Sequence, residues 1–231
     1  MPELPEVETV ARQLAPDLRG RTITAVSILD DRLAVRRPEA LLGRTVEGVE
    51  RRGKQVVLTL SGVDGAGARR WVAIHLRMTG RLHVAPSPTA GPHVRAQIHL
   101  ERGVLEFSDP RRFGTLTVHR RRSETAPPGL EPLTSTLTAR RLGGLMEGSR
   151  TPLKPWLLRQ DRLVGIGNIY ASEIPFRARL DPRRPAGGLD AHEIRRLHRA
   201  LRRVLRDAID NCGTTFSDFQ DARGVEGSYQ H

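Results

Sequence analysis

The hydrophobic pattern of this 231-residue chain changes its period twice, and these changes limit the possible folds more than any other feature. Between residues 22 and 118, short runs alternate apolar and polar residues, which is typical of strands with one buried face. These runs are Thr22–Leu29, Thr45–Arg51, Lys54–Leu60, Arg70–Leu76, Ala96–Leu100, Val104–Ser108 and Gly114–Val118. Turn sequences such as Arg52-Gly53 separate them, so we expect a β-sandwich or barrel.

Helical spacing replaces the alternation at both ends of the chain. The apolar residues of Leu4–Leu18 recur at helical spacing and predict an N-terminal amphipathic helix. Beyond residue 133, helices are expected at Thr138–Glu147, Lys154–Gln160, Asn168–Ile174 and Asp190–Asn211. Asp190 is the expected N-cap of the last helix, and Gly213 follows its end.

The segment 121–133 is rich in charge and proline and has no periodic pattern, so we expect it to be a linker. The fold class that follows is α+β. A β-sandwich domain with an N-terminal helix is predicted for residues 1–120, and a helical domain for residues 134–231.

The charge of the chain favours a polyanionic partner. Lys and Arg number 38 against 26 Asp and Glu, which leaves a net charge of +12. Such an excess is typical of proteins that bind nucleic acid, although acidic lipids and ribosomes attract basic proteins as well. Lys54 and Lys154 are the only lysines, so these sites either need a compact, titratable ammonium or survive from a bias towards arginine codons.

Cysteine usage and hydropathy indicate the cellular compartment in which the protein is expected. Cys212 is the single cysteine, which rules out a disulfide framework and a multi-cysteine zinc site within the sequence, and we expect it to be partly buried. No apolar stretch is long enough to span a membrane, and the acidic start MPELPEVE lacks the basic region of a signal peptide. The cytoplasm is the expected location, with no membrane partner.

The segment 1–6 (MPELPE) carries the first candidate chemistry. Removal of Met1 would leave Pro2 with a free secondary amine, whose ordinary pKa of about 7.7–8.0 keeps a good fraction neutral and nucleophilic. Glu3 stands beside it as a proton donor or acceptor. The alternative is an ordinary helix start, because proline and acidic residues are both favoured in a first turn.

This start resembles that of the formamidopyrimidine-DNA glycosylases, and three further segments match the same family in order. The resemblance implies that Pro2 is the nucleophile and Glu3 the acid. It also implies that Lys54, after the turn at Arg52-Gly53, contacts the phosphate of the target nucleotide and assists proton transfer. Without the resemblance, Lys54 is a solvated hairpin tip.

The second matching segment is residues 75–80 (HLRMTG). By resemblance, Met78 fills the gap that an extruded nucleotide leaves in the base stack, and His75 contacts a phosphate. Arg77 stands where the family has glycine. His93 is a further DNA contact that the resemblance implies. Met78 is otherwise a core residue and His75 an ordinary strand histidine.

The third matching segment is residues 109–114 (DPRRFG), which resembles the family's intercalation loop. Phe113 would wedge between bases, and Arg111 would hydrogen-bond the base that loses its partner. The alternative is a hairpin turn with solvated arginines and Phe113 in the core.

The fourth match comprises Lys154-Pro155-Trp156 and residues 165–173 (GIGNIYASE), and it looks like the family's helix–two-turn–helix motif. Asn168 is expected to cap the second helix and to offer its amide to a phosphate, while Lys154 binds the same backbone. A shorter match at residues 213–219 (GTTFSDF) implies that Thr214 and Thr215 lie in the loop that closes over the flipped base.

The resemblance implies a monomeric glycosylase and abasic-site lyase that excises 8-oxoguanine and formamidopyrimidines from double-stranded DNA by β,δ-elimination. Abasic sites would be substrates too. No metal or other cofactor is expected, because the family's C-terminal four-cysteine zinc finger has no counterpart in the sequence. Two alternatives remain: an endonuclease VIII-like enzyme for oxidised pyrimidines, and a damaged-DNA-binding protein without catalysis.

Overall fold

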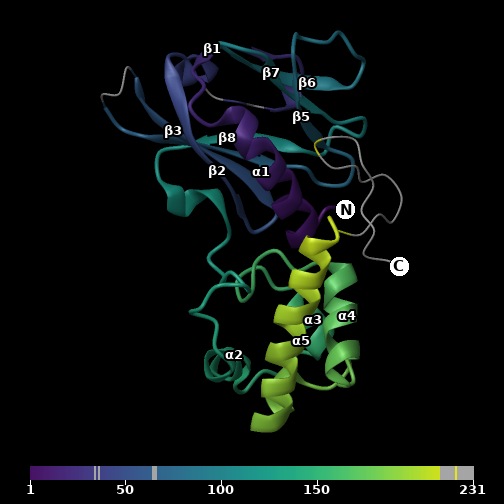
Figure 1. Cartoon of the computed structure of the whole chain (residues 1–231). Coiled ribbons are helices and arrows are strands. Elements are labelled where there is room, and N and C mark those ends of the chain that lie inside the picture. The colour runs from purple at the N-terminus through teal and green to yellow at the C-terminus, as the bar shows by residue number, and fades with distance from the viewer. Residues whose placement is uncertain (34, 36, 64–66, 214–221, 223–231) are drawn as a thin grey trace.

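The structure is a computed structural model that describes residues 1–33, 35, 37–63, 67–213 and 222. Figure 1 shows a β-rich lobe built from the N-terminal half of the chain and a helical lobe built from most of the rest. Two antiparallel sheets, an N-terminal helix and a C-terminal helical region confirm the predicted α+β class.

Each sheet of the β-rich lobe has four antiparallel strands. The first, in the order β1-β6-β7-β5, consists of β1 (Ile23–Ile28), β6 (Val94–Leu100), β7 (Val104–Ser108) and β5 (Arg81–Ala85). The second, in the order β2-β3-β4-β8, consists of β2 (Arg44–Arg52), β3 (Gln55–Val63), β4 (Arg70–His75) and β8 (Thr115–His119). Short 3₁₀ turns η1 (Asp31–Leu33) and η2 (Pro38–Leu41) lie between β1 and β2.

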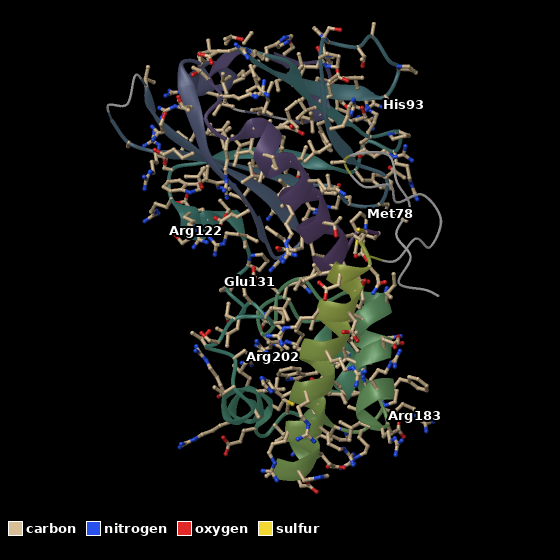
Figure 2. All side chains as sticks on the ribbon, in the orientation of Figure 1. Met78, His93, Arg122, Glu131, Arg183 and Arg202 are labelled. Carbon is tan, nitrogen blue, oxygen red and sulfur yellow. The ribbon has the colours of Figure 1, made fainter. Side chains whose placement is uncertain are left out.

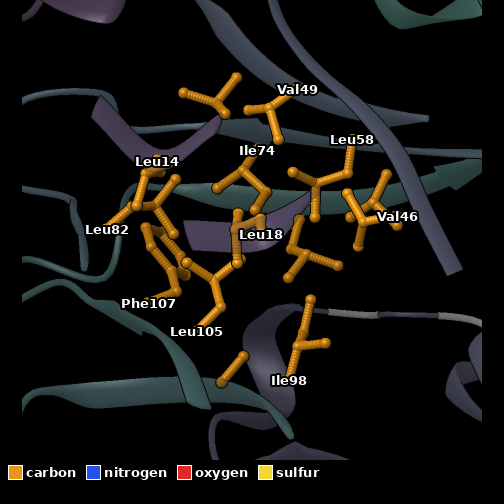
Figure 3. Close-up of a cluster of buried hydrophobic side chains, with 14 of the residues drawn as sticks. Leu14, Leu18, Val46, Val49, Leu58, Ile74, Leu82, Ile98, Leu105 and Phe107 are labelled. Atoms are coloured by element: carbon orange, nitrogen blue, oxygen red, sulfur yellow. The ribbon is translucent and has the colours of Figure 1, made fainter. Parts of the chain in front are cut away.

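Both sheets share one hydrophobic core with helix α1 (Leu4–Leu18), as Figure 3 shows. Leu14 of α1, Ile74 of β4 and Phe107 of β7 meet there, and none is more than 2% exposed. Truncating such a side chain to alanine typically costs about 2–5 kcal/mol. This packing therefore fixes the direction in which α1 presents its first turn.

Strand β5 (Arg81–Ala85) was not predicted from the sequence. It is an edge strand that pairs only with β7, and its five residues begin with the exposed Arg81. Leu82 and Val84 alternate with polar residues there, and pairing with β7 stabilises the strand at the edge of the sheet.

The helical lobe has its own core, centred on the buried rings of Trp156 and Tyr170. Its helices are α2 (Ala139–Met146), α3 (Leu153–Leu157), α4 (Asn168–Ala178) and α5 (Ala191–Asp210), with a 3₁₀ turn η4 (Ala186–Gly188). Asp190 caps α5 as predicted, accepting hydrogen bonds from the backbone N–H groups of His192 and Glu193.

The segment between the lobes is more ordered than its composition suggests. It begins with the 3₁₀ turn η3 (Arg122–Thr125), and Arg122 donates two hydrogen bonds to the Glu50 carboxylate. Further along, Leu130 exchanges backbone hydrogen bonds with the loop before α4, at Arg162 and Val164. The assignment of residues 1–120, 121–133 and 134–231 to separate domains stays a prediction.

The start of α1 joins the two lobes directly. The backbone N–H of Leu4 donates to the carbonyl of Gly165, 3.0 Å away, and the Leu4 side chain belongs to the core of the helical lobe. At the same end of that lobe, Gly213 follows α5 with φ +83° and packs against Glu6. The first turn of α1 is therefore held by segments that lie far away in the sequence.

Cys212 lies just before Gly213 and is exposed, so the expectation of partial burial was wrong. It takes a left-handed conformation with φ +59° just after the end of α5. Within the described part of the chain, no helix is both long and apolar enough to cross a membrane.

Candidate active site

Glu3 is the centre of the candidate site. It precedes the first residue of α1 and is only 2% exposed. Its carboxylate accepts hydrogen bonds from the backbone N–H groups of Gly167 at 2.7 Å and Ile169 at 2.9 Å, with a longer one from Tyr170 at 3.4 Å. These groups form the N-terminal end of α4, so Glu3 caps a helix more than 160 residues away in the sequence.

The predicted capping role of Asn168 was therefore wrong. Gly167 is the N-cap residue of α4 and Asn168 its first residue, and the cap has no hydrogen bond from a side chain of its own segment. The Glu3 carboxylate accepts from the backbone N–H groups of Gly167 and Ile169 instead, and the Asn168 side chain is exposed.

Burial raises the pKa of the Glu3 carboxyl above its ordinary value. The hydrogen bond from Ile169 and the positive charge of Lys54 oppose that shift, whereas the nearby Glu6 adds to it. A carboxyl that keeps its proton closer to neutral pH than an ordinary glutamate is suited to both donating and accepting a proton.

Glu6 completes a buried acidic pair. One of its carboxylate oxygens accepts from the Glu3 backbone N–H at 2.8 Å, and the other accepts from the Tyr170 hydroxyl at 2.6 Å. Sequence reasoning assigned Glu6 no role, although the spacing of Glu3 and Glu6 is that of a capping box. Gly213 touches the same carboxylate, since a Cβ there would lie 2.8 Å from Glu6 Oε1.

Lys54 reaches the site from the turn between β2 and β3. Burial lowers the pKa of its ammonium, although the carboxylates of Glu3 and Glu6 act in the opposite direction. Gly167 lies between the two functional groups: a Cβ there would sit 2.4 Å from Glu3 Cδ and 2.8 Å from Lys54 Nζ. The absence of a side chain at Gly167 is what allows the carboxylate and the ammonium to converge.

Pro2 is buried beside Glu3, whereas Met1 is 47% exposed. Met1 is still attached here, so the Pro2 nitrogen belongs to an amide. Loss of the exposed Met1 would place a secondary amine at the edge of the group formed by Glu3 and Lys54.

His75 ends β4 and is largely buried, which lowers the pKa of its ring to about 4, with further lowering from the charges of Arg77 and Lys54. The neutral ring accepts a hydrogen bond at Nδ1 from the Arg77 backbone N–H, 3.0 Å away. Arg77 has φ +54°, a left-handed conformation that glycine adopts more easily. That explains why glycine suits this position.

Asp109 organises the loop of residues 109–114, and it was missed as a functional residue. It is completely buried, and its carboxylate accepts from the backbone N–H groups of Phe113 at 2.8 Å and Gly114 at 2.7 Å. The Thr79 hydroxyl donates to the other carboxylate oxygen. Asp109 therefore ties the segment that carries Met78 to the loop that carries Phe113.

Met78 and Phe113 are not core residues, because they are 43% and 52% exposed. The guanidinium of Arg111 stacks on the Phe113 ring, with its carbon 4.9 Å from the ring centroid. The adjacent Arg112 donates to the Asp30 carboxylate and thereby fastens the base of the loop. The loop holds an aromatic ring and a guanidinium outward on a rigid support.

The remaining predicted site residues lie further from Glu3. His93 is exposed in the loop before β6, and its carbonyl accepts from the Asp109 backbone N–H at 2.8 Å. Figure 2 shows Met78 and His93 along the same side of the β-rich lobe. Lys154 lies half-buried in α3. Thr214 and Thr215 lie outside the described residues.

The structure thus brings Glu3, which follows the buried Pro2 in the chain, and Lys54 together at the junction of the lobes, and it links the Met78 and Phe113 segments through Asp109. Among the described residues, no group of three or more His, Cys, Asp and Glu side chains could hold a metal ion.

Two family models match most of the chain. The formamidopyrimidine-DNA glycosylase N-terminal domain matches residues 1–116, and the formamidopyrimidine-DNA glycosylase H2TH domain matches residues 129–220. A formamidopyrimidine-DNA glycosylase of Chloroflexus aurantiacus is 40% identical over an alignment of 241 residues, gaps included. The alignment covers 100% of this chain and 84% of the relative.

Solved structures give the same result. The MutM (Fpg) protein of Thermus thermophilus has a TM-score of 0.87 and 40% identity, over 99% of this chain and 85% of that one. Structures of Lactococcus lactis Fpg or a variant, in complex with DNA that contains Fapy-dG, an abasic site or an oxidised pyrimidine, have a TM-score of 0.85 and 28% identity. They match 99% of this chain and 85 or 86% of theirs.

Proposed function

The chain belongs to the formamidopyrimidine-DNA glycosylase family, and on that basis we propose that it excises oxidised purines from duplex DNA and then cleaves the strand. The proposed substrates are 8-oxoguanine and formamidopyrimidine nucleotides, and abasic sites enter at the second step. DNA glycosylase activity follows from the family, whereas the lesion class and the lyase step are the proposal.

The observation that carries the proposal is the position of the Glu3 carboxyl. It is buried, its pKa is raised, and it lies beside Pro2, with the Lys54 ammonium on the same side of Gly167. The site thus combines a proton donor, a cation and a potential amine nucleophile. This combination suits the opening of a sugar ring.

In the proposed reaction, removal of Met1 frees the Pro2 amine, whose lone pair attacks C1′ of the extruded nucleotide. The new C–N bond replaces the glycosidic bond, the base leaves with a proton, and the opened sugar forms an iminium with Pro2. Loss of the C2′ proton expels the 3′-phosphate, and loss of the C4′ proton expels the 5′-phosphate. Water then hydrolyses the iminium and releases Pro2.

In this reaction, Glu3 is the acid that protonates the sugar ring oxygen while C1′ is attacked. Its raised pKa supports that role, because a larger share of the carboxyl is protonated near neutral pH. Lys54 is proposed to hold the phosphate of the target nucleotide. Its lowered pKa makes proton transfer at that point easier than for an exposed lysine.

The net charge of +12 supports binding of the DNA backbone. Lys154 and Asn168 are proposed to contact phosphates. Because Glu3 already occupies the N–H groups at the start of α4, the side-chain amide of Asn168 is the available donor there. His75 and His93 are proposed as further phosphate contacts.

The exposed side chains of Met78 and Phe113 are proposed to fill the gap left by the extruded nucleotide, with Arg111 on the base that has lost its partner. Their exposure on a loop fastened by the buried Asp109 supports this role, since a wedge must be both accessible and rigid. Thr214 and Thr215 are proposed to lie close to the flipped base.

An oxidised pyrimidine is a second candidate lesion, because one of the solved complexes of Lactococcus lactis Fpg contains DNA with such a base. The proposed chemistry uses the Pro2 amine, side chains and water. A monomer in the cytoplasm stays a prediction.

The function is tested with matched duplexes that contain 8-oxoguanine, a formamidopyrimidine, an oxidised pyrimidine or an undamaged base. We expect base release and strand cleavage on the first two, with both phosphate ends left on the flanking strands. Release confined to the oxidised pyrimidine would contradict the purine assignment, and binding without any base release would favour a non-catalytic protein.

A further inference from the structure

Glu106 is a carboxylate placed in the interior of a sheet. It lies in β7, is completely buried, and has Gln97 of β6 and His83 of β5 as its cross-strand neighbours. Burying a carboxylate costs free energy unless hydrogen bonds satisfy it, and an apolar residue would fill such a place at lower cost. The presence of the Glu106 carboxylate in the sheet interior therefore indicates a role beyond packing.

The hydrogen bonds of Glu106 converge on one residue of the loop between β5 and β6. Thr89 donates its backbone N–H to Oε1 and its hydroxyl to Oε2, both at 2.7 Å. Gln97 donates to Oε1 at 2.7 Å and to the Thr89 carbonyl at 2.9 Å, and His83 lies 3.2 Å from Oε2. Every polar group of Thr89 is therefore engaged.

The loop that Thr89 belongs to has little else to hold it. Each residue from Pro86 to His93 is exposed, so the loop contributes no buried side chain. Two further described hydrogen bonds tie the loop to its surroundings: the His93 carbonyl accepts from the Asp109 backbone N–H, and the Gly91 carbonyl accepts from the backbone N–H of Val94, the first residue of β6. Thr89 and His93 are thus fastened to two buried carboxylate residues near the end of the same strand.

The electrostatics agree with a permanent anchor. Burial raises the pKa of Glu106, but the hydrogen bonds from Thr89 and Gln97 lower it more, and the result lies below the ordinary value. The carboxylate stays ionised at neutral pH and keeps accepting from all its donors. A charge-assisted hydrogen bond is stronger than a neutral one.

We propose that Glu106 is a positioning residue for DNA binding: it fixes Thr89, and through Thr89 the loop that presents His93 to a backbone phosphate. The inference rests on the proposed function, since it takes His93 as a phosphate contact. A loop held in its binding conformation loses less entropy when it meets the DNA, so the anchor strengthens binding without touching it.

The test uses a duplex that carries a tetrahydrofuran abasic analogue and measures its Kd with the full chain by fluorescence anisotropy. Thr89→Val keeps the shape and removes one hydrogen bond to Glu106, and Glu106→Gln removes the charge. Each should raise the Kd by about 5- to 10-fold, the loss expected for one charge-assisted hydrogen bond. Glu101→Gln, an exposed carboxylate in the neighbouring turn, is the matched control and should change nothing.

A double-variant comparison separates positioning from general stability. Thr89→Val combined with His93→Ala should weaken binding no more than His93→Ala alone, because both changes remove the same contact. In single-turnover excision by Thr89→Val, the enzyme concentration that gives the half-maximal rate should rise, whereas the maximal rate should stay unchanged.

Additive losses of affinity would overturn the proposal, as would wild-type affinity in a folded Thr89→Val protein. If Glu106→Gln fails to fold, Thr89→Val decides the matter, since Thr89 is exposed. The proposed function fails independently, if the wild-type protein releases no oxidised base from any of the duplexes above.

Discussion

Gly167→Ala is the substitution whose effect follows most directly from the geometry of the site. Gly167 has φ −124° and ψ −161°, an extended conformation that alanine adopts without strain. The new Cβ would nevertheless lie 2.4 Å from Glu3 Cδ, 2.5 Å from Glu3 Oε1 and 2.8 Å from Lys54 Nζ. Ordinary contacts begin at about 3.4 Å, so the carboxylate must move by about 1 Å.

A misplacement of about 1 Å at a reacting group can cost about 10²-fold in rate. We therefore expect single-turnover excision of 8-oxoguanine by Gly167→Ala to fall by about that factor, while binding of an undamaged duplex changes little. Gly144→Ala is the matched control. Gly144 is exposed in α2, with nothing within 4 Å of its added Cβ, and alanine there should stabilise the helix by about 0.5–1 kcal/mol.

Thermal melts of both variants accompany the rate measurements. An excision rate of Gly167→Ala within about twofold of the wild type would refute the reasoning, because the carboxylate cannot keep its place beside a Cβ. A large fall in melting temperature with an equal loss of undamaged-DNA binding would point instead to a general disturbance of the junction between the lobes.

Three further predictions concern binding, extrusion and pH. Lys154→Ala should weaken binding to damaged and undamaged duplexes alike and lower the salt slope by about one, whereas a loss limited to damaged DNA would contradict a phosphate contact. Phe113→Ala should slow excision from a paired duplex far more than cleavage at a pre-formed abasic site, with little change in melting temperature because the ring is half exposed; equal losses on both substrates would reject the wedge. His75 has a pKa of about 4 when folded and about 6.5 when unfolded, so the unfolded state binds more protons between these values and stability falls as pH drops through them. Melting temperatures of His75→Gln should decline less steeply over that window, and an unchanged slope would count against the buried neutral ring.

The elements that local pattern predicted are those with one face packed on a hydrophobic core. The alternation of strands such as β3 and β4 reflects a face packed on one core, so it was visible without the structure. Strand β5 was missed although Leu82 and Val84 alternate with polar residues; its place at the edge of the sheet is set by pairing with β7.

The site shows where local reasoning ends. Asn168 was the obvious cap for α4, yet the cap comes from Glu3 at the other end of the chain. The convergence of Glu3 and Lys54 was implied by family resemblance, and nothing in the spacing of the two residues indicates it. Asp109 joins two loops through hydrogen bonds to Thr79 and Phe113 that only the tertiary structure reveals.

Covalent trapping of the terminal amine tests the central claim most directly. Protein that has lost Met1 is incubated with an 8-oxoguanine duplex and sodium borohydride, and the site of attachment is read by mass spectrometry of the proteolysed adduct. We predict a stable adduct on the nitrogen of Pro2, and none when Met1 is retained, because the nitrogen is then an amide without a nucleophilic lone pair. An adduct of equal yield with Met1 still attached, or attachment at Lys54 instead, would contradict the account.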